Sequence, residues 1–270
     1  MAASLTVPKM FAAFDKPLGV QLYTVRNLLP TKGEETLRAI AAIGYKEVEI
    51  SLPDAKKFAA VLKETGLKAT GSHIDGTAGA IAPAKLDGYI AKAKELGIPA
   101  IGLAYVPAPE RKDPAAFWPP FADQLNQAAE QCKKAGLTFY YHHHNFEFDP
   151  KFRAIDLLHD KLAKDVKLEI DCFWASVGGS DPVTFIEQWN GRLFALHLKD
   201  KGKDTPNSYD TDQVKKTDFL EVGSGSIDWP KVLKAAVKAG ARHFYVEQDA
   251  TPGDPIDSLK KSYAYLRSVS

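Results

Sequence analysis

One local pattern repeats along the chain and limits the folds that the sequence can adopt. A helical run rich in Ala, Lys and Leu ends in a glycine, and a short run of β-forming residues that ends in a polar residue follows it. Residues 41–44 precede residues 47–50 in this way, and residues 63–66 precede residues 67–70. The same order recurs at Gly97, Gly136, Gly191 and Gly240. A glycine at the end of a helix adopts the left-handed conformation that lets the chain turn into the next strand.

Together with residues 19–23 and 166–171, these repeats give eight expected strands separated by helical runs. Alternating β-α units predict parallel strands joined by helical crossovers, and eight strands close a (β/α)8 barrel. The alternative is an open doubly wound sheet, but no glycine-rich phosphate turn follows the first strand. We therefore predict an α/β fold, a single-domain (β/α)8 TIM barrel over residues 18–270, with an irregular leader over residues 1–17.

The charge balance argues against several classes of partner. Lys and Arg number 35 and Asp and Glu 34, so the formal net charge is only +1. This balance provides no field to attract nucleic acid or an anionic membrane, and we expect a small-molecule partner. No apolar run is long enough for a transmembrane helix. The start also lacks the charged and apolar blocks of a signal peptide, which slightly favours the cytoplasm, while the sequence leaves export open. The sequence leaves the oligomeric state open.

Polar residues gather where the expected strands end. In a barrel these ends and the following loops form one face, which carries the active site. The longest loop, residues 200–219, follows a strand end and is a candidate lid. Residues 223–225 read as a second loop, with Asp228 capping the next helix. The strand ends carry Gln21, Tyr23, Glu49, His73, the cluster from His142 to Glu147, Asp171, His197, Lys199 and Glu247.

Three of these residues suggest a metal site. Asp171, His197 and Glu247 supply the oxygen and nitrogen ligands that suit Mn²⁺, Mg²⁺, Co²⁺ or Zn²⁺. A fourth ligand would come from the fifth strand, where His142 and Glu147 are both candidates. A structural alternative exists for single residues, since Glu169 or Lys199 could form an ion pair inside the barrel.

Four motifs resemble the sugar phosphate isomerase/epimerase family of xylose-isomerase-like barrels. They are GVQLYTVR at residues 19–26, YHHHNFEF at 141–148, LEIDCFW at 168–174 and ALHLKD at 195–200. The resemblance spans about residues 18–266 and implies one divalent ion held by strands five to eight. Carried onto this sequence, the ligands are Glu147, Asp171, His197 and Glu247, with Glu147 preferred to His142. Two features depart from the ketohexose epimerases: histidines replace their strand-five glutamate region, and Trp174 stands where many members have histidine.

The resemblance also implies a reaction. The leading hypothesis is a metal-dependent isomerase or epimerase that forms an enediolate from a keto-sugar or polyol, with Glu247 and Glu147 as the pair of bases. Lys199 and His144 would stabilise charge on the substrate oxygens. Trp174, Tyr23 and Phe146 are candidates for an apolar wall. The remaining substrate-binding candidates are Gln21, Glu49, His73 and His142.

Three other functions remain open. A lyase or dehydratase would use the same enediolate and expel a β-substituent from a keto-sugar or keto-inositol, and the histidines of the fifth strand favour it, because an imidazole can protonate a leaving group. A metal-dependent endonuclease ranks low, because the chain has no basic surplus for DNA. The last alternative is a non-catalytic sugar-binding barrel.

Overall fold

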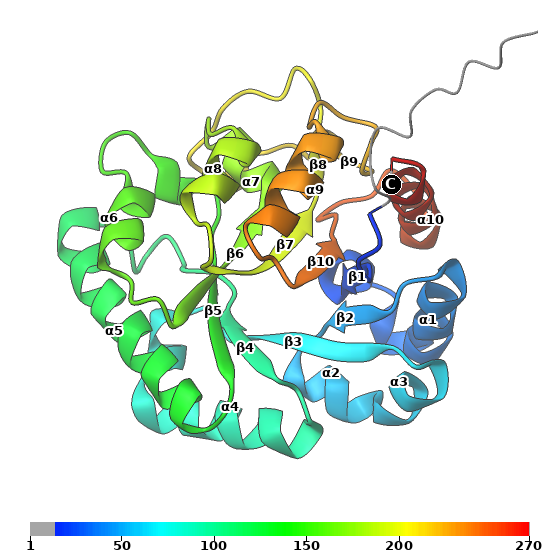
Figure 1. The fold of residues 1–270 in the computed structure, drawn as a ribbon, viewed down its shortest axis with the longest axis horizontal. Helices are drawn as coiled ribbons and strands as arrows, with labels where there is room; N and C mark the ends of the chain where they lie inside the picture. The colour runs from blue at the N-terminus through cyan, green and yellow to red at the C-terminus, as the bar shows by residue number, and fades with distance from the viewer. Residues whose placement is uncertain (1–13, 270) are drawn as a thin grey trace, which may run out of the picture.

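The computed structural model describes residues 14–269, and eight parallel strands in this range close into a barrel (Figure 1). The strands follow one another around the barrel in chain order, and β10 pairs with β1 to close it. The predicted (β/α)8 barrel is therefore confirmed. The barrel strands are β1 Gly19–Gln21, β2 Glu47–Glu49, β3 Lys68–Ile74, β4 Ala100–Leu103, β5 Thr138–His142, β6 Val166–Asp171, β7 Leu193–Leu198 and β10 His243–Val246.

Helices surround the strands on the outside of the barrel (Figure 1). Several begin at an aspartate whose side chain accepts a backbone hydrogen bond from the first turn, including the predicted cap Asp228. The glycines expected to end helices do so, as at Gly97, where φ is 68°. The helices are α1 Leu29–Ile43, α2 Leu52–Lys57, α3 Ala59–Thr65, α4 Pro83–Leu96, α5 Pro114–Lys134, α6 Ala154–Lys161, α7 Cys172–Val177, α8 Pro182–Gln188, α9 Trp229–Lys238 and α10 Pro255–Ser268.

Strand alternation divides the buried side chains between two cores. Tyr140 points into the barrel, where it stacks on Phe194 with ring centroids 4.1 Å apart. Its neighbour Tyr141 points outward and meets Phe121 of α5, with ring centroids 5.9 Å apart. Successive residues of β5 thus enter different environments. His142, two residues after Tyr140, returns to the inside.

Strand pairing fixes both ends of the expected lid loop, residues 200–219. β8, Asp200–Lys201, pairs antiparallel with β9, Phe219–Leu220. The buried carboxylate of Asp200 accepts hydrogen bonds from five groups, which belong to its neighbour and to the segment that leads into α9. The donors are the backbone N–H groups of Lys201, Gly223, Gly225 and Ile227 and the indole N–H of Trp229.

The predicted leader lies mostly outside the described residues, which begin at Phe14, and residues 14–17 form neither helix nor strand. No helix between residues 14 and 269 is long and apolar enough to cross a membrane.

Candidate metal centre

A cavity of about 770 Å³ opens at the carboxyl ends of the barrel strands, as the barrel fold predicts. Residues of the expected lid, including Thr211 and Lys216, form part of its wall. Glu49 and Glu147 are not among the described residues that line it. The site residues predicted from the sequence that do line it are Gln21, Tyr23, His73, His142, His144, Trp174, Lys199 and Glu247.

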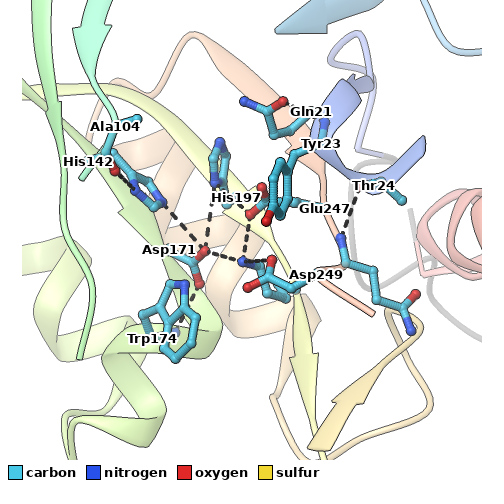
Figure 2. Close-up of polar contacts among 12 residues, drawn as sticks. Gln21, Tyr23, Thr24, Ala104, His142, Asp171, Trp174, His197, Glu247 and Asp249 are labelled. Carbon is cyan, nitrogen blue, oxygen red and sulfur yellow. Dashed lines mark hydrogen bonds and ion pairs between the residues drawn. The ribbon is translucent and has the colours of Figure 1, made fainter. Parts of the chain in front are cut away.

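Four buried side chains converge next to this cavity (Figure 2), and two of them, His142 and Glu247, line it. We call them the upper group: His142, Asp171, His197 and Glu247. His197 Nδ1 lies 3.1 Å from Glu247 Oε2 and 3.6 Å from Asp171 Oδ2. His142 Nε2 lies 3.6 Å from the same oxygen of Asp171. One ligand atom from each residue lies within 4.8 Å of the other three.

The register of the strands brings this group together. Asp171 at the end of β6 pairs with His197 of β7. Glu247 directly follows β10, and its N–H donates to the Leu198 carbonyl oxygen of β7. His142 ends β5, and its Nδ1 lies 3.0 Å from the Ala104 carbonyl oxygen, which leaves Nε2 to face Asp171 (Figure 2).

The residues fit a divalent metal ion. Within the described part of the chain, none of the four converging atoms has a hydrogen-bond partner. Buried polar atoms without hydrogen-bond partners are costly, and a divalent ion bound among these four would satisfy all of them. Two carboxylates and two imidazoles suit Mn²⁺, Co²⁺ or Zn²⁺ better than Mg²⁺, which prefers oxygen ligands alone.

Lys199 places a positive charge next to two carboxylates of the upper group. Its ammonium lies 3.0 Å from Asp171 Oδ2 and 2.6 Å from Glu247 Oε2, contacts that are ion pairs and not aligned hydrogen bonds. Burial alone would raise the carboxyl pKa values, but the Lys199 charge overrides it. The pKa of Asp171 is held well below its usual value, and that of Glu247 is lowered to about 2.

A second buried group lies next to the first and shares His197 with it. We call Glu49, His73, Glu169 and His197 the lower group. Glu49 Oε2 accepts hydrogen bonds from Gln21 Nε2 at 2.6 Å and from His197 Nε2 at 2.9 Å, and Glu49 Oε1 accepts one from the Tyr140 hydroxyl. Glu169 Oε2 lies 2.7 Å from His73 Nε2. Glu49 was expected to bind substrate, but it is fully buried among these partners.

The structure does not bring Glu147 to either group, although the sequence resemblance made it the preferred strand-five ligand. Glu147 lies in a 3-10 turn, Phe146–Phe148, and accepts hydrogen bonds from the Tyr141 hydroxyl at 2.5 Å and from the His144 N–H at 2.9 Å. Tyr141 faces outward from β5, so Glu147 follows it to the outer side of the strand. Burial raises the pKa of Glu147 to about 7, since its partners are neutral donors. His142 is the residue of the β5 region that belongs to the upper group.

One wall of the cavity is built from rings. The His144 ring lies 4.9 Å from Tyr105 and 5.3 Å from Trp174 between centroids, and its Nδ1 has no hydrogen-bond partner among the described residues. Burial, together with the charges of His142 and Lys199, lowers the pKa of His144 well below its usual value, so the imidazole is neutral. Phe146, expected in this wall, stacks behind His144 and lines a separate surface cavity with Arg111.

The opposite rim carries Tyr23, whose ring is half-exposed beneath the Arg26 guanidinium, 3.9 Å away.

The sequence analysis missed Asp249. Its carboxylate lines the cavity and lies 2.7 Å from Lys199 Nζ. The signal was present, because Asp249 follows Glu247 by two residues and alternation extends beyond β10. Glu169 was considered only as a structural ion pair, yet it follows the same rule, two residues before Asp171.

The (β/α)8 barrel thus carries a buried cluster of imidazoles and carboxylates at its carboxyl face, a donor set that can hold a divalent ion. Residues 37–269 match the family described as xylose isomerase-like TIM barrel. The chain belongs to this family.

The proteins that this chain resembles carry the names of several activities. An inosose dehydratase from Lacticaseibacillus casei is 25% identical over 159 residues, which are 55% of this chain and 53% of that protein. The chain thus spans about half the length of the curated relatives that it matches. A sugar phosphate isomerase/epimerase from Parabacteroides distasonis has a TM-score of 0.74 and 25% identity, covering 99% of this chain and 98% of its own. The IOLI protein with a bound zinc atom shares the fold, with a TM-score of 0.72 and 18% identity, covering 93% of this chain and 98% of its own.

Proposed function

We propose that the protein is a divalent-metal-dependent lyase or dehydratase that forms an enediolate from a keto-sugar or keto-inositol and eliminates a β-substituent. The second candidate is an isomerase or epimerase that uses the same enediolate. The two reactions share their first proton transfer and differ only in the fate of the enediolate.

The observation that carries this proposal is the upper group, whose unpartnered ligand atoms lie beneath a cavity of substrate size. His142, Asp171, His197 and Glu247 would hold the ion. The bound ion would act as a Lewis acid that polarises the substrate carbonyl and acidifies the neighbouring C–H bond. The remaining steps are assigned to side chains that line the cavity.

We assign proton removal to the carboxylates of Glu247 and Asp249, which both line the cavity. Both contact Lys199, whose ammonium is fixed beside them and would stabilise negative charge on a substrate oxygen. Asp249 retains partial exposure, with 24% of its side chain accessible, so it can meet substrate directly. Glu247 is 7% exposed and lies closer to the proposed ion.

The position of Glu147 favours elimination over epimerisation. An epimerase that uses two carboxylates needs one on each face of the enediolate, and Glu147 was expected opposite Glu247. Because Glu147 lies on the outer side of β5, its carboxyl group cannot face the cavity. Across the barrel from β10, strand β3 and the segment after β5 present the imidazoles of His73 and His144 to the cavity instead. The identity of the curated relatives as inosose dehydratases also supports elimination.

The elimination balances with these groups. A carboxylate accepts the proton from the carbon next to the carbonyl, and the electron pair of that C–H bond forms the enediolate. The bond from the β-carbon to its oxygen substituent then breaks, and the electron pair leaves with the oxygen. The imidazole of His73 donates a proton to that oxygen, which departs as water or an alcohol and leaves an unsaturated ketone. Burial opposes protonation of His73, but the carboxylates of Glu49 and Glu169 outweigh it and raise its pKa.

The test is isotope exchange in D₂O with the metal-loaded protein and a panel of keto-sugars and keto-inositols. We expect deuterium at the carbon next to the carbonyl of recovered substrate, and a product lighter by water or an alcohol. An unchanged product mass with exchange would favour the isomerase or epimerase. No exchange with any compound, despite sugar binding, would contradict both and favour the non-catalytic barrel.

Variants of the two strand-five candidates sharpen this test. Glu147→Gln should retain exchange, because Glu147 belongs to neither buried group, whereas His144→Ala should slow the elimination by removing a ring N–H that can hydrogen-bond to a substrate oxygen. Loss of exchange in a folded, metal-loaded Glu147→Gln protein would restore the two-carboxylate mechanism of an epimerase.

A further inference from the structure

We propose that Glu49 is a positioning residue that keeps the hydrogen of His197 on Nε2, so that Nδ1 faces the upper group and the protein binds one divalent ion, not two. This inference rests on the metal site of the proposed function. It concerns the lower group, whose atoms are also close enough together to hold an ion.

The contacts of Glu49 require hydrogen donors around it. Its carboxylate is fully buried and accepts hydrogen bonds from Gln21 Nε2, His197 Nε2 and the Tyr140 hydroxyl. An amide nitrogen and a phenol can both donate, which satisfies the buried charge without a cation. His197 Nε2, 2.9 Å away, meets the same oxygen as Gln21 and therefore carries a hydrogen. An imidazole that binds metal through Nδ1 keeps a hydrogen on Nε2.

The two groups differ in how their atoms are satisfied. In the upper group all four converging atoms lack a hydrogen-bond partner among the described residues. In the lower group only Glu169 Oε1 lacks a hydrogen-bond partner among the described residues, and this oxygen lies 3.3 Å from His197 Nε2. An ion in the lower group would have to remove the hydrogen from His197 Nε2 and displace Gln21 or Tyr140 from Glu49. Hydrogen bonds thus satisfy the lower group, whereas the converging atoms of the upper group are arranged for a metal ion.

Such a contact has a measurable effect. A carboxylate that accepts the second N–H of a metal-binding histidine fixes its orientation and raises its basicity, and loss of the carboxylate lowers metal affinity about 10-fold to 100-fold. We expect this loss in Glu49→Ala. Glu49→Gln should stay close to the wild type, because its amide oxygen can still accept the hydrogen bond from Nε2.

The chain provides a matched control on the same strand. Glu47 of β2 is also buried and contacts an imidazole, His243 Nδ1, at 2.8 Å. His243 belongs to neither group. Glu47→Ala therefore removes an equivalent carboxylate–imidazole pair and should leave Zn²⁺ affinity unchanged.

Three measurements on the full-length protein test the inference: Zn²⁺ affinity of the wild type and these variants, bound zinc per chain, and ¹⁵N NMR of the histidines in the Zn²⁺-loaded wild type. We expect one zinc ion per chain, and a His197 ring with a proton on Nε2 and a metal-shifted Nδ1. Two zinc ions per chain, an unprotonated Nε2, or equal affinities for Glu49→Ala and Glu47→Ala would overturn the inference. If Glu49→Ala does not fold, the wild-type spectrum and stoichiometry still decide.

These readouts separate the inference from the proposed function. A protein that binds one zinc ion with the expected tautomer, yet exchanges no deuterium with keto-sugars, contradicts the function and leaves the role of Glu49 intact. Exchange together with unaffected metal binding in Glu49→Ala contradicts only the role of Glu49.

Discussion

Glu147 and Glu247 are both buried glutamates that follow barrel strands, and their surroundings are opposite. Glu147 is satisfied by a phenol and a backbone N–H, and its pKa is raised to about 7. Glu247 contacts Lys199 and His197, and its pKa is lowered to about 2. Burial is common to both, so the partners decide the charge. A carboxylate on the inner face is available to a cation, whereas the carboxyl group on the outer side of β5 has only neutral hydrogen-bond donors as partners.

The largest expected effect is on metal content. Asp171→Asn and His197→Ala each remove a ligand of the upper group and should abolish bound metal, while Glu147→Gln should retain one ion per chain. Elemental analysis of purified variants measures this directly. Stoichiometric metal in both ligand variants would remove the upper group as the metal site, and metal loss in Glu147→Gln would erase the difference between the two glutamates.

A second prediction concerns the cation beside Glu247. Lys199→Met leaves the carboxylates of Asp171, Glu247 and Asp249 without their common partner, and breaking such a buried pair costs about 3–5 kcal/mol of unfolding free energy. We expect this loss in metal-free protein and a smaller loss with Mn²⁺ or Zn²⁺, which neutralises two of the same carboxylates. Denaturant unfolding with and without metal measures it.

The control for this variant is Lys261→Met. Lys261 pairs with Glu221 at 3.1 Å and is 65% exposed, so its loss should cost less than about 1 kcal/mol. Equal losses in the two lysine variants would mean that the buried ion pairs contribute no more than an exposed one.

The third prediction uses the pH dependence of Glu147. Its folded pKa of about 7 lies above the ordinary value of 4.5, so the folded state binds more protons between these pH values. Stability should therefore fall as pH rises from about 4.5 to about 7, by on the order of 3 kcal/mol. Glu147→Gln should remove this part of the dependence. Unfolding free energies measured across the range for both proteins would reject the prediction if their slopes agree.

The smallest effect is expected from Tyr141→Phe. Loss of the hydroxyl that donates to Glu147 should cost on the order of 1 kcal/mol above pH 7 and raise the Glu147 pKa further, because that hydrogen bond lowers it. Tyr245→Phe, which loses a hydroxyl contact to Thr70, is the matched control and should leave the pH midpoint unchanged. The same midpoint shift in both variants would contradict a specific link to Glu147.

The sequence predicted the barrel because its signals are local. Gly97 and similar glycines end helices whatever the tertiary context, and β-forming runs such as Val166–Asp171 mark the strands. The inward direction of the candidate ligands Asp171 and His197 follows from their positions at strand ends.

The choice between His142 and Glu147 could not be made in this way. Alternation assigns His142 to the inner face, but Glu147 lies beyond β5, where the path of the chain depends on tertiary contacts such as the Tyr141 hydroxyl. The family pattern favoured Glu147 by residue type, and the packing favours His142. Asp249 was missed although it follows Glu247 by two residues, because it lies beyond the end of β10.

The hydrogen bonds of Asp200 have a consequence for protein engineering. They join the start of the loop between Lys201 and Phe219 to the segment that enters α9, so both ends of this loop are fixed without help from its middle. The middle supplies Thr211, Asp212, Val214 and Lys216 to the cavity wall. We therefore expect this loop to behave as an exchangeable cassette: grafting a different sequence between the β8–β9 anchors should change which substrates the protein accepts while the metal ligands stay in place.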